Sequence, residues 1–212
     1  MSAAGLSFAQ ATPAQRRTLI AAALGWMLDS FDVMLFALVL TSIVADFGIS
    51  RATAGKLATL TLLASGIGGV LFGWIADRIG RTRALMLSIL TYSICSLASG
   101  LATSITMLAV FRCLLGLGMG GEWNTGATLV TETWPMELRA KAFALVQSSW
   151  AIGYALAALV AGIVLHYATW RAVFFVGVLP ALLVLWIRKD VPESELWLKR
   201  TKVQGNRPVA AP

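Results

Sequence analysis

Four charged residues lie inside otherwise apolar stretches of this chain, and they are the first candidates for chemistry. Asp29 and Asp32 interrupt the stretch "GWMLDSFDVMLFALVL", and Arg112 and Glu122 stand at the two ends of "RCLLGLGMGGE". A charge at the centre of a membrane costs about 3 kcal/mol on insertion scales, so such residues normally face a polar cavity or one another. Each of the four therefore needs a partner or a function.

The depth of each charge in the membrane indicates which of them can meet. Asp32 lies about 20 Å from the start of its helix, at about 1.5 Å per residue, and Arg112 lies about 10 Å below the opposite surface of a core about 30 Å thick. The two heights agree, so we predict that Asp32 pairs with Arg112. Glu122 lies about 15 Å farther along its helix, too far to serve Arg112 directly. Asp29 lies one turn from Asp32 on the same helix face.

An aspartate paired with an arginine in a membrane is a candidate proton site. The arginine favours the ionised carboxylate, whereas burial disfavours it. When substrate or solvent displaces the arginine, the carboxylate can take up a proton. The alternative is a buried ion pair that only fixes the register of two helices, but that reading gives no reason for the second carboxylate at Asp29.

The apolar stretches must be the helices that position these residues. The 212 residues are 58% hydrophobic and 13% charged, whereas a soluble domain has about 25% charged residues. About 20 apolar residues cross a bilayer as a helix, and barrel strands would instead alternate apolar and polar residues. We predict an all-α membrane protein with six transmembrane helices at residues 19–45, 57–76, 84–103, 105–130, 142–165 and 172–187.

The formal net charge of +7 is divided unequally between the two sides of the predicted bundle. With the N-terminus inside, 13 of the 17 Lys and Arg residues are cytoplasmic, Arg112 lies in a span, and only Arg51, Lys56 and Arg171 are outside. The positive-inside rule then predicts that both termini are cytoplasmic. We expect a multi-pass protein of the cytoplasmic (inner) membrane whose surroundings are the lipid bilayer and not a nucleic acid.

Three segments organise the chain: a cytoplasmic tail at 1–17, whose first fifteen residues we expect to be disordered, a six-helix bundle at 18–190, and a polar cytoplasmic tail at 191–212.

No cofactor or metal is predicted, because Cys95 and Cys113 fall inside spans, where cysteine usually behaves as a small apolar residue. An enzyme is not expected either. A six-helix intramembrane serine protease needs a G-x-S-G motif and a histidine on another helix, and the single histidine, His166, follows the fifth predicted span.

The turn between the second and third predicted spans, residues 73–83, reads "GWIADRIGRTR". Its glycines permit close approach of neighbouring helices, and its charges suit contacts with helix ends. The turn resembles the signature loop of the major facilitator superfamily, G-x-x-x-D-R-x-G-R-x-R, which in that family works as a gating latch against the second half of the carrier. The resemblance assigns this role to Gly73, Asp77, Arg78, Gly80, Arg81 and Arg83.

Three further segments match the family in the right order. The segment "RCLLGLGMGGE" resembles the fourth-helix pattern R-x-x-x-G-x-G-x-G-G. The segment "ETWPMELRAKA" resembles the loop after that helix and adds Glu132 and Arg139 to the gating residues. The segment "PESELWL" resembles the sequence past the sixth helix, although Glu195 and Leu196 stand where many members have Pro-Arg.

Within the superfamily, the chain looks most like the sialic acid/proton symporters and the related metabolite or aromatic-acid/proton symporters. The resemblance implies transport of protons together with a small organic anion such as a sugar acid. It implies that Asp32 is the proton-coupling carboxylate and that Asp29 and Arg112 act with it. It also implies a substrate cavity that includes Arg112, Glu122, Trp123 and Asn124.

A carrier of this superfamily has twelve helices in two pseudo-symmetric halves with the substrate between them. The chain therefore resembles the N-terminal half, a 3+3 inverted repeat, and we expect as its partner either a C-terminal six-helix half or a second copy of itself. The alternative is a truncated, non-transporting membrane fragment or scaffold.

Overall fold

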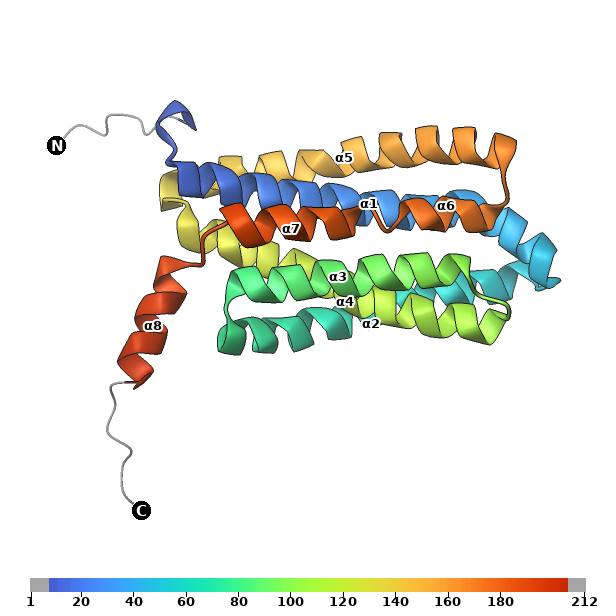
Figure 1. Ribbon diagram of the computed structural model, residues 1–212, viewed down its shortest axis with the longest axis horizontal. Helices are drawn as coiled ribbons and strands as arrows, with labels where there is room; N and C mark the ends of the chain where they lie inside the picture. Colours follow the sequence, from blue (N-terminus) through green and yellow to red (C-terminus); the bar gives the residue numbers. More distant parts are fainter. Residues whose placement is uncertain (1–7, 206–212) are drawn as a thin grey trace, which may run out of the picture.

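The computed structural model describes residues 8–205, and every regular element among them is a helix. Six segments of this part of the chain are long and apolar enough to cross a membrane, and the sixth of them is made of two helices. Figure 1 shows the long helices side by side along one direction, with the last helix turned away from the bundle at the end where the first long helix begins. The elements are η1 (Phe8–Gln10), α1 (Pro13–Phe47), α2 (Arg51–Ile79), α3 (Arg81–Gly100), α4 (Ile105–Thr133), α5 (Met136–Tyr167), α6 (Trp170–Val176), α7 (Pro180–Asp190) and α8 (Glu195–Gly205).

Helix α4 is central, because it packs against α1, α2 and α3, while α1 also packs along α5. The contact between α2 and α4 is close because α4 carries glycine where the two backbones meet. A Cβ atom at Gly116 would collide with the Thr61 carbonyl, and one at Gly120 would collide with the Ser65 carbonyl. Small residues at such positions let membrane helices approach closely and gain dispersion contacts.

The sixth predicted span is interrupted, which the sequence interpretation did not anticipate. Helix α6 ends at Val176 and α7 begins at Pro180, and the amides of the residues between them bond to carbonyls only three residues back. Proline has no N–H to continue the helical pattern, and its ring clashes with the preceding turn. The break also brings Gly177 against the Ser96 side chain of α3, where a Cβ atom would collide.

The prediction of a disordered N-terminal segment was wrong for residues 8–15; residues 1–7 lie outside the described part of the chain. Thr12 and Gln15 form a capping box that starts α1 at Pro13, several residues before the predicted span. The Phe8 ring stacks on Trp134 at a centroid distance of 4.6 Å. These contacts satisfy helix-end donors and bury an aromatic ring, so the segment is ordered against the bundle.

The boundaries after the fifth span also differ from the prediction. Helix α5 continues to Tyr167, so His166 lies in its last turn and not beyond it. The polar tail contains α8, whose start is fixed by Ser194, because its hydroxyl accepts from the Trp197 amide. Trp197 in turn donates its indole N–H to the Asp77 carbonyl at 2.9 Å, which ties α8 to the end of α2.

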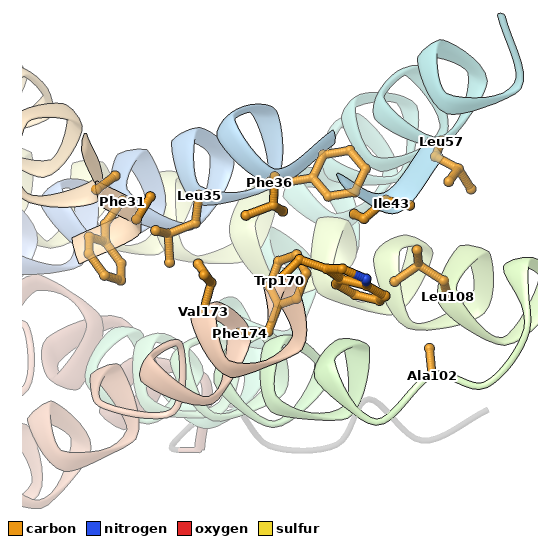
Figure 2. Close-up of a cluster of buried hydrophobic side chains, with 13 residues drawn as sticks. Phe31, Leu35, Phe36, Ile43, Leu57, Ala102, Leu108, Trp170, Val173 and Phe174 are labelled. Carbon is orange, nitrogen blue, oxygen red and sulfur yellow. The ribbon is translucent and has the colours of Figure 1, made fainter. Parts of the chain in front are cut away.

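The largest apolar cluster surrounds the half of α1 that follows Asp29 and Asp32. Figure 2 shows Phe36 and Ile43 of α1 facing Trp170 and Phe174 of α6, with Leu108 of α4 nearby. The cluster therefore fixes α1, α4 and α6 relative to one another in the half of the bundle that follows Asp32 along α1.

Candidate functional site

The predicted pairing of Asp32 with Arg112 is confirmed. The Arg112 Nη1 atom lies 3.0 Å from the Asp32 Oδ2 atom, and the two side chains are only 1% and 2% exposed. The pair joins α1 to α4 across the middle of the bundle. Removal of one partner of such a buried ion pair strongly destabilises the folded protein, because the other charge is left uncompensated.

Two aromatic rings and a hydroxyl complete the surroundings of the pair. The Arg112 guanidinium lies between the rings of Phe36 and Phe174, at 4.4 and 4.5 Å from their centroids. The Ser96 hydroxyl of α3 donates a hydrogen bond to the second oxygen of Asp32. The Arg112 atoms Nε and Nη2 find no hydrogen-bond partner among the described residues, so part of the guanidinium is free to bind another acceptor.

The two remaining buried carboxyls lie together. Asp29 and Glu122 are each 1% exposed, and their carboxyl groups are within hydrogen-bonding reach of each other. Gly25 provides the space, because a Cβ atom there would collide with the Glu122 carboxyl. Two contacting carboxyls in a buried site cannot both be ionised without a large cost, so the pair is suited to holding a shared proton.

Two neighbouring cavities border Asp29 and the Asp32–Arg112 pair. One of about 370 Å³ is lined by Asp29, Trp123 and Asn124 together with residues of α1, α2, α4 and α5. A smaller one of about 140 Å³ is lined by Asp32 and Arg112. Both cavities are also lined by Val33, Leu62 and Met119, so the two adjoin across these apolar side chains.

The predicted gating loop forms a compact charge network at the turn between α2 and α3. Arg81 is 5% exposed and pairs with Asp77 at 2.9 Å and with Glu132 of α4 at 3.1 Å. Arg81 also donates to the Ala76 carbonyl at 2.9 Å. The Asp77 side chain is 73% exposed, so its carboxylate still presents charge at the surface.

The other gating residues are less tightly joined. Arg78 lies over the Trp74 ring at 3.6 Å, Arg139 donates to the Trp134 carbonyl at 3.0 Å, and Arg83 is exposed. The expected close approach at the glycines holds at Gly80, which has φ of 103° and lies against Glu193. At Gly73 no described atom lies within 4 Å of the position of an added Cβ, so no described neighbour packs against this glycine.

The structure brings the predicted residues together as two sites. Asp29, Asp32, Arg112 and Glu122 lie on adjoining helices near the two cavities, while the gating residues lie at the α2–α3 turn. Trp123 and Asn124 line the larger cavity, whereas Glu122 contacts Asp29 and is not among the residues that line it.

Several contributors were missed from the sequence. Glu193 accepts from the backbone amides of Arg81 and Thr82 at 2.8 and 3.2 Å, which caps the N-terminus of α3 with a carboxylate. Its position in the segment "PESELWL" was the available signal. Ser96 and Phe174 carried no comparable signal, because a serine or a phenylalanine in an apolar helix is common.

Comparison with known proteins decides the family. The model of the Major Facilitator Superfamily matches residues 22–211. The chain belongs to this superfamily. The match confirms the predicted family and fold class, and superfamily members are transporters and not enzymes.

Two curated superfamily members illustrate the similarity. The chain is 42% identical to the sialic acid transporter NanX of Escherichia coli over 91% of its own length and 47% of the relative. It is 39% identical to a probable 4-methylmuconolactone transporter of Cupriavidus pinatubonensis over 92% of its length and 47% of the relative. The chain thus spans about half the length of the curated relatives that it matches.

A solved member has the same fold. The partially occluded, inward-open structure of the xylose transporter XylE from E. coli superposes with a TM-score of 0.82 and 21% identity, covering 92% of this chain and 52% of the solved one. This coverage agrees with the predicted N-terminal six-helix half of a superfamily fold.

Proposed function

We propose that the chain supplies the N-terminal half of a proton-coupled symporter for a small organic anion, with a sugar acid of the sialate type as the first candidate substrate. The observation that carries the proposal is the buried Asp32–Arg112 pair at 3.0 Å beside a cavity. The names of the relatives, which include transporters of sialic acid and of 4-methylmuconolactone, support an organic acid as the substrate.

The pair supplies a mechanism in which proton and anion enter together. With Asp32 ionised, Arg112 is already neutralised, so a substrate carboxylate meets no free positive charge. A proton on Asp32 removes the negative charge of that carboxylate. The Arg112 guanidinium then binds the substrate carboxylate in place of Asp32. One proton and one monovalent anion leave the charge of the site unchanged, so neither is bound stably without the other.

The remaining predicted residues fit this scheme. Asp29 and Glu122 hold a second shared proton close to the cavity. The charge network of Arg81, Asp77 and Glu132 acts as the latch of the α2–α3 turn, and the exposed Asp77 carboxylate is its contact with a second six-helix unit. That unit is a C-terminal half or a second copy of this chain, because alternating access requires two units that rock around a shared site.

We further propose that the protein lies in the cytoplasmic (inner) membrane with the α2–α3 turn, the start of α1 and α8 on the cytoplasmic side. Most of the basic residues lie at this end, as the positive-inside rule requires. The Arg17 guanidinium donates to the Asp190 carbonyl at 3.1 Å, which joins the start of α1 to the end of α7.

Uptake into membrane vesicles tests the proposal. The chain is produced alone and together with the other half of the E. coli sialic acid transporter, and labelled sialic acid is supplied under a pH gradient that is acid outside. We expect accumulation with both halves present and its loss when a protonophore collapses the gradient. No accumulation above that of vesicles lacking the chain would favour the non-transporting alternative.

A further inference from the structure

Three tryptophans from three helices form one continuous aromatic surface beside the buried carboxyls. Trp26 of α1 lies between Trp123 of α4 and Trp150 of α5, with ring centroids 4.1 and 4.6 Å apart. All three indoles are only partly buried, and all three line the cavity of about 370 Å³. This surface is therefore available to a bound molecule and is not closed within the apolar core.

Polar atoms at the same cavity point to a ligand. The Asp29 Oδ1 atom and the Trp26 indole N–H are buried and find no hydrogen-bond partner among the described residues, and both side chains line the cavity. Buried polar atoms of this kind are normally paired, since leaving one unpaired is costly. An acceptor and a donor thus stand next to a broad aromatic surface.

The rest of the lining leaves room for a ring. Gly66, Gly69 and Gly120 contribute no side chain to the cavity, and Val33, Leu62 and Met119 are aliphatic or thioether groups. Indole rings bind the face of another ring by offset stacking and by burying its apolar surface. The cavity therefore suits a ring more than a flexible chain, whose rotational freedom would be lost on binding.

The position of the arginine sets the orientation of that ring. Val33, Leu62 and Met119 line both this cavity and the smaller one that borders Arg112, so one small molecule can extend from the indoles toward the guanidinium. The Arg112 atoms Nε and Nη2 are the donors without a protein partner at that end.

We infer that Trp26, Trp123 and Trp150 form a subsite for the ring of a ring-bearing carboxylate, whose carboxylate points toward Arg112 and whose ring hydroxyl or N–H donates to Asp29. The orientation toward Arg112 rests on the proposed transport function, whereas the ring subsite rests on the indoles and the cavity. Rings of two kinds share this chemistry, a planar aromatic acid and a saturated sugar acid, and open-chain acids of the same charge are disfavoured.

Equilibrium binding to the purified 212-residue chain in lipid nanodiscs tests the subsite without any proton gradient. The labelled probes are benzoate, sialic acid and hexanoate, which represent a planar ring, a sugar ring and an open chain. We expect at least one ring acid to bind about tenfold more tightly than hexanoate. The two ring probes then distinguish a planar ring from a sugar ring, and tighter binding of either one supports the subsite.

Substitutions locate the binding at the indoles. Trp123→Leu and Trp150→Leu should each weaken binding of the preferred ring acid about tenfold, and Trp123→Phe should recover part of that loss, because it restores an aromatic face. The control is Trp74→Leu on α2, which is 54% exposed and outside the cavity, and it should bind as the unsubstituted chain does. Circular dichroism checks that each variant keeps its helical content.

Three results would overturn the subsite: hexanoate binding as tightly as the ring acids, unchanged ring binding in both leucine variants, or no binding of either ring acid. These results are distinguishable from a failure of the proposed function. Ring binding without gradient-driven uptake in the vesicle experiment would retain the subsite and reject symport. Gradient-driven uptake together with unchanged ring binding in both leucine variants would reject the subsite and retain symport.

Discussion

Ser96 on α3 donates a hydrogen bond to Asp32 on α1, so the carboxylate that pairs with Arg112 is held from two sides. Ser96 is itself in contact with Gly177, the first residue of the break between α6 and α7. The interrupted sixth span is thus joined through one serine to the buried ion pair. Phe174, one turn before the break, covers the Arg112 guanidinium and makes the same connection by a second route.

The contact at Ser96 predicts that Gly177→Ala is destabilising. The added methyl group would collide with the Ser96 hydroxyl, and overpacking of this kind costs about 1–3 kcal/mol. The matched control is Gly162→Ala in α5, where no described atom lies within contact distance and a glycine in a helix interior is replaced by a better helix former. Thermal unfolding in detergent should show a lower midpoint for Gly177→Ala and an equal or higher one for Gly162→Ala. Equal midpoints for Gly177→Ala and the unsubstituted chain would show that the break is not in firm contact with α3.

The carboxylate cap on α3 predicts a stability difference between two neighbouring glutamates. Glu193 accepts from the amides of Arg81 and Thr82, and loss of such an N-terminal cap costs about 0.5–2 kcal/mol. Glu195 forms an exposed pair with Lys199 at 3.7 Å, and such a pair is worth about 0–1 kcal/mol. Glu193→Ala should therefore lower the unfolding midpoint more than Glu195→Ala does, by the same thermal measurement. The reverse order would reject the cap as a structural element of the gating turn.

The proposed orientation predicts which end of the bundle a membrane-impermeant reagent can reach from outside the cell. Ala52→Cys near the start of α2 and Arg200→Cys on α8 both place a thiol at an exposed position, in a background where Cys95 and Cys113 are replaced by alanine. A membrane-impermeant thiol reagent added to whole cells should label position 52 and not position 200, because the basic end of the bundle stays inside. Labelling of position 200 alone would invert the proposed topology.

Much of the fold was predictable because the signals are local. Twenty-residue apolar stretches define the spans, and helical rise alone placed Asp32 and Arg112 at one depth. Applied to Asp29 and Glu122, the same arithmetic gives a separation of about 10 Å, yet the two carboxyls are in contact. The count assumes parallel helices, and it ignores the length of the glutamate side chain and the space left by Gly25.

The features that sequence reasoning missed depend on tertiary contacts. The Trp26–Trp123–Trp150 surface draws one residue from each of three helices, so no spacing along the chain marks it. The break before Pro180 was concealed by its apolar surroundings, because the segment is long enough to be one span whether or not it is interrupted. Order at Phe8 arises from packing on Trp134, which local polarity does not indicate.

Asp32 couples the proton to the substrate in the proposed mechanism, and uptake by Asp32→Asn in a carrier assembled from this chain and a C-terminal half tests that role. Asparagine keeps the shape of a protonated aspartate but cannot release or accept the proton, so the bound anion is no longer coupled to the pH gradient. The control is Asp46→Asn at the far end of α1, where Asp46 is 41% exposed and pairs with Arg171 at 2.8 Å. With labelled substrate and a pH gradient that is acid outside, we predict that Asp32→Asn abolishes accumulation above equilibrium while exchange of internal for external substrate continues, and that Asp46→Asn still accumulates substrate. Gradient-driven accumulation by Asp32→Asn equal to that of the unsubstituted carrier would exclude Asp32 as the proton-coupling carboxylate.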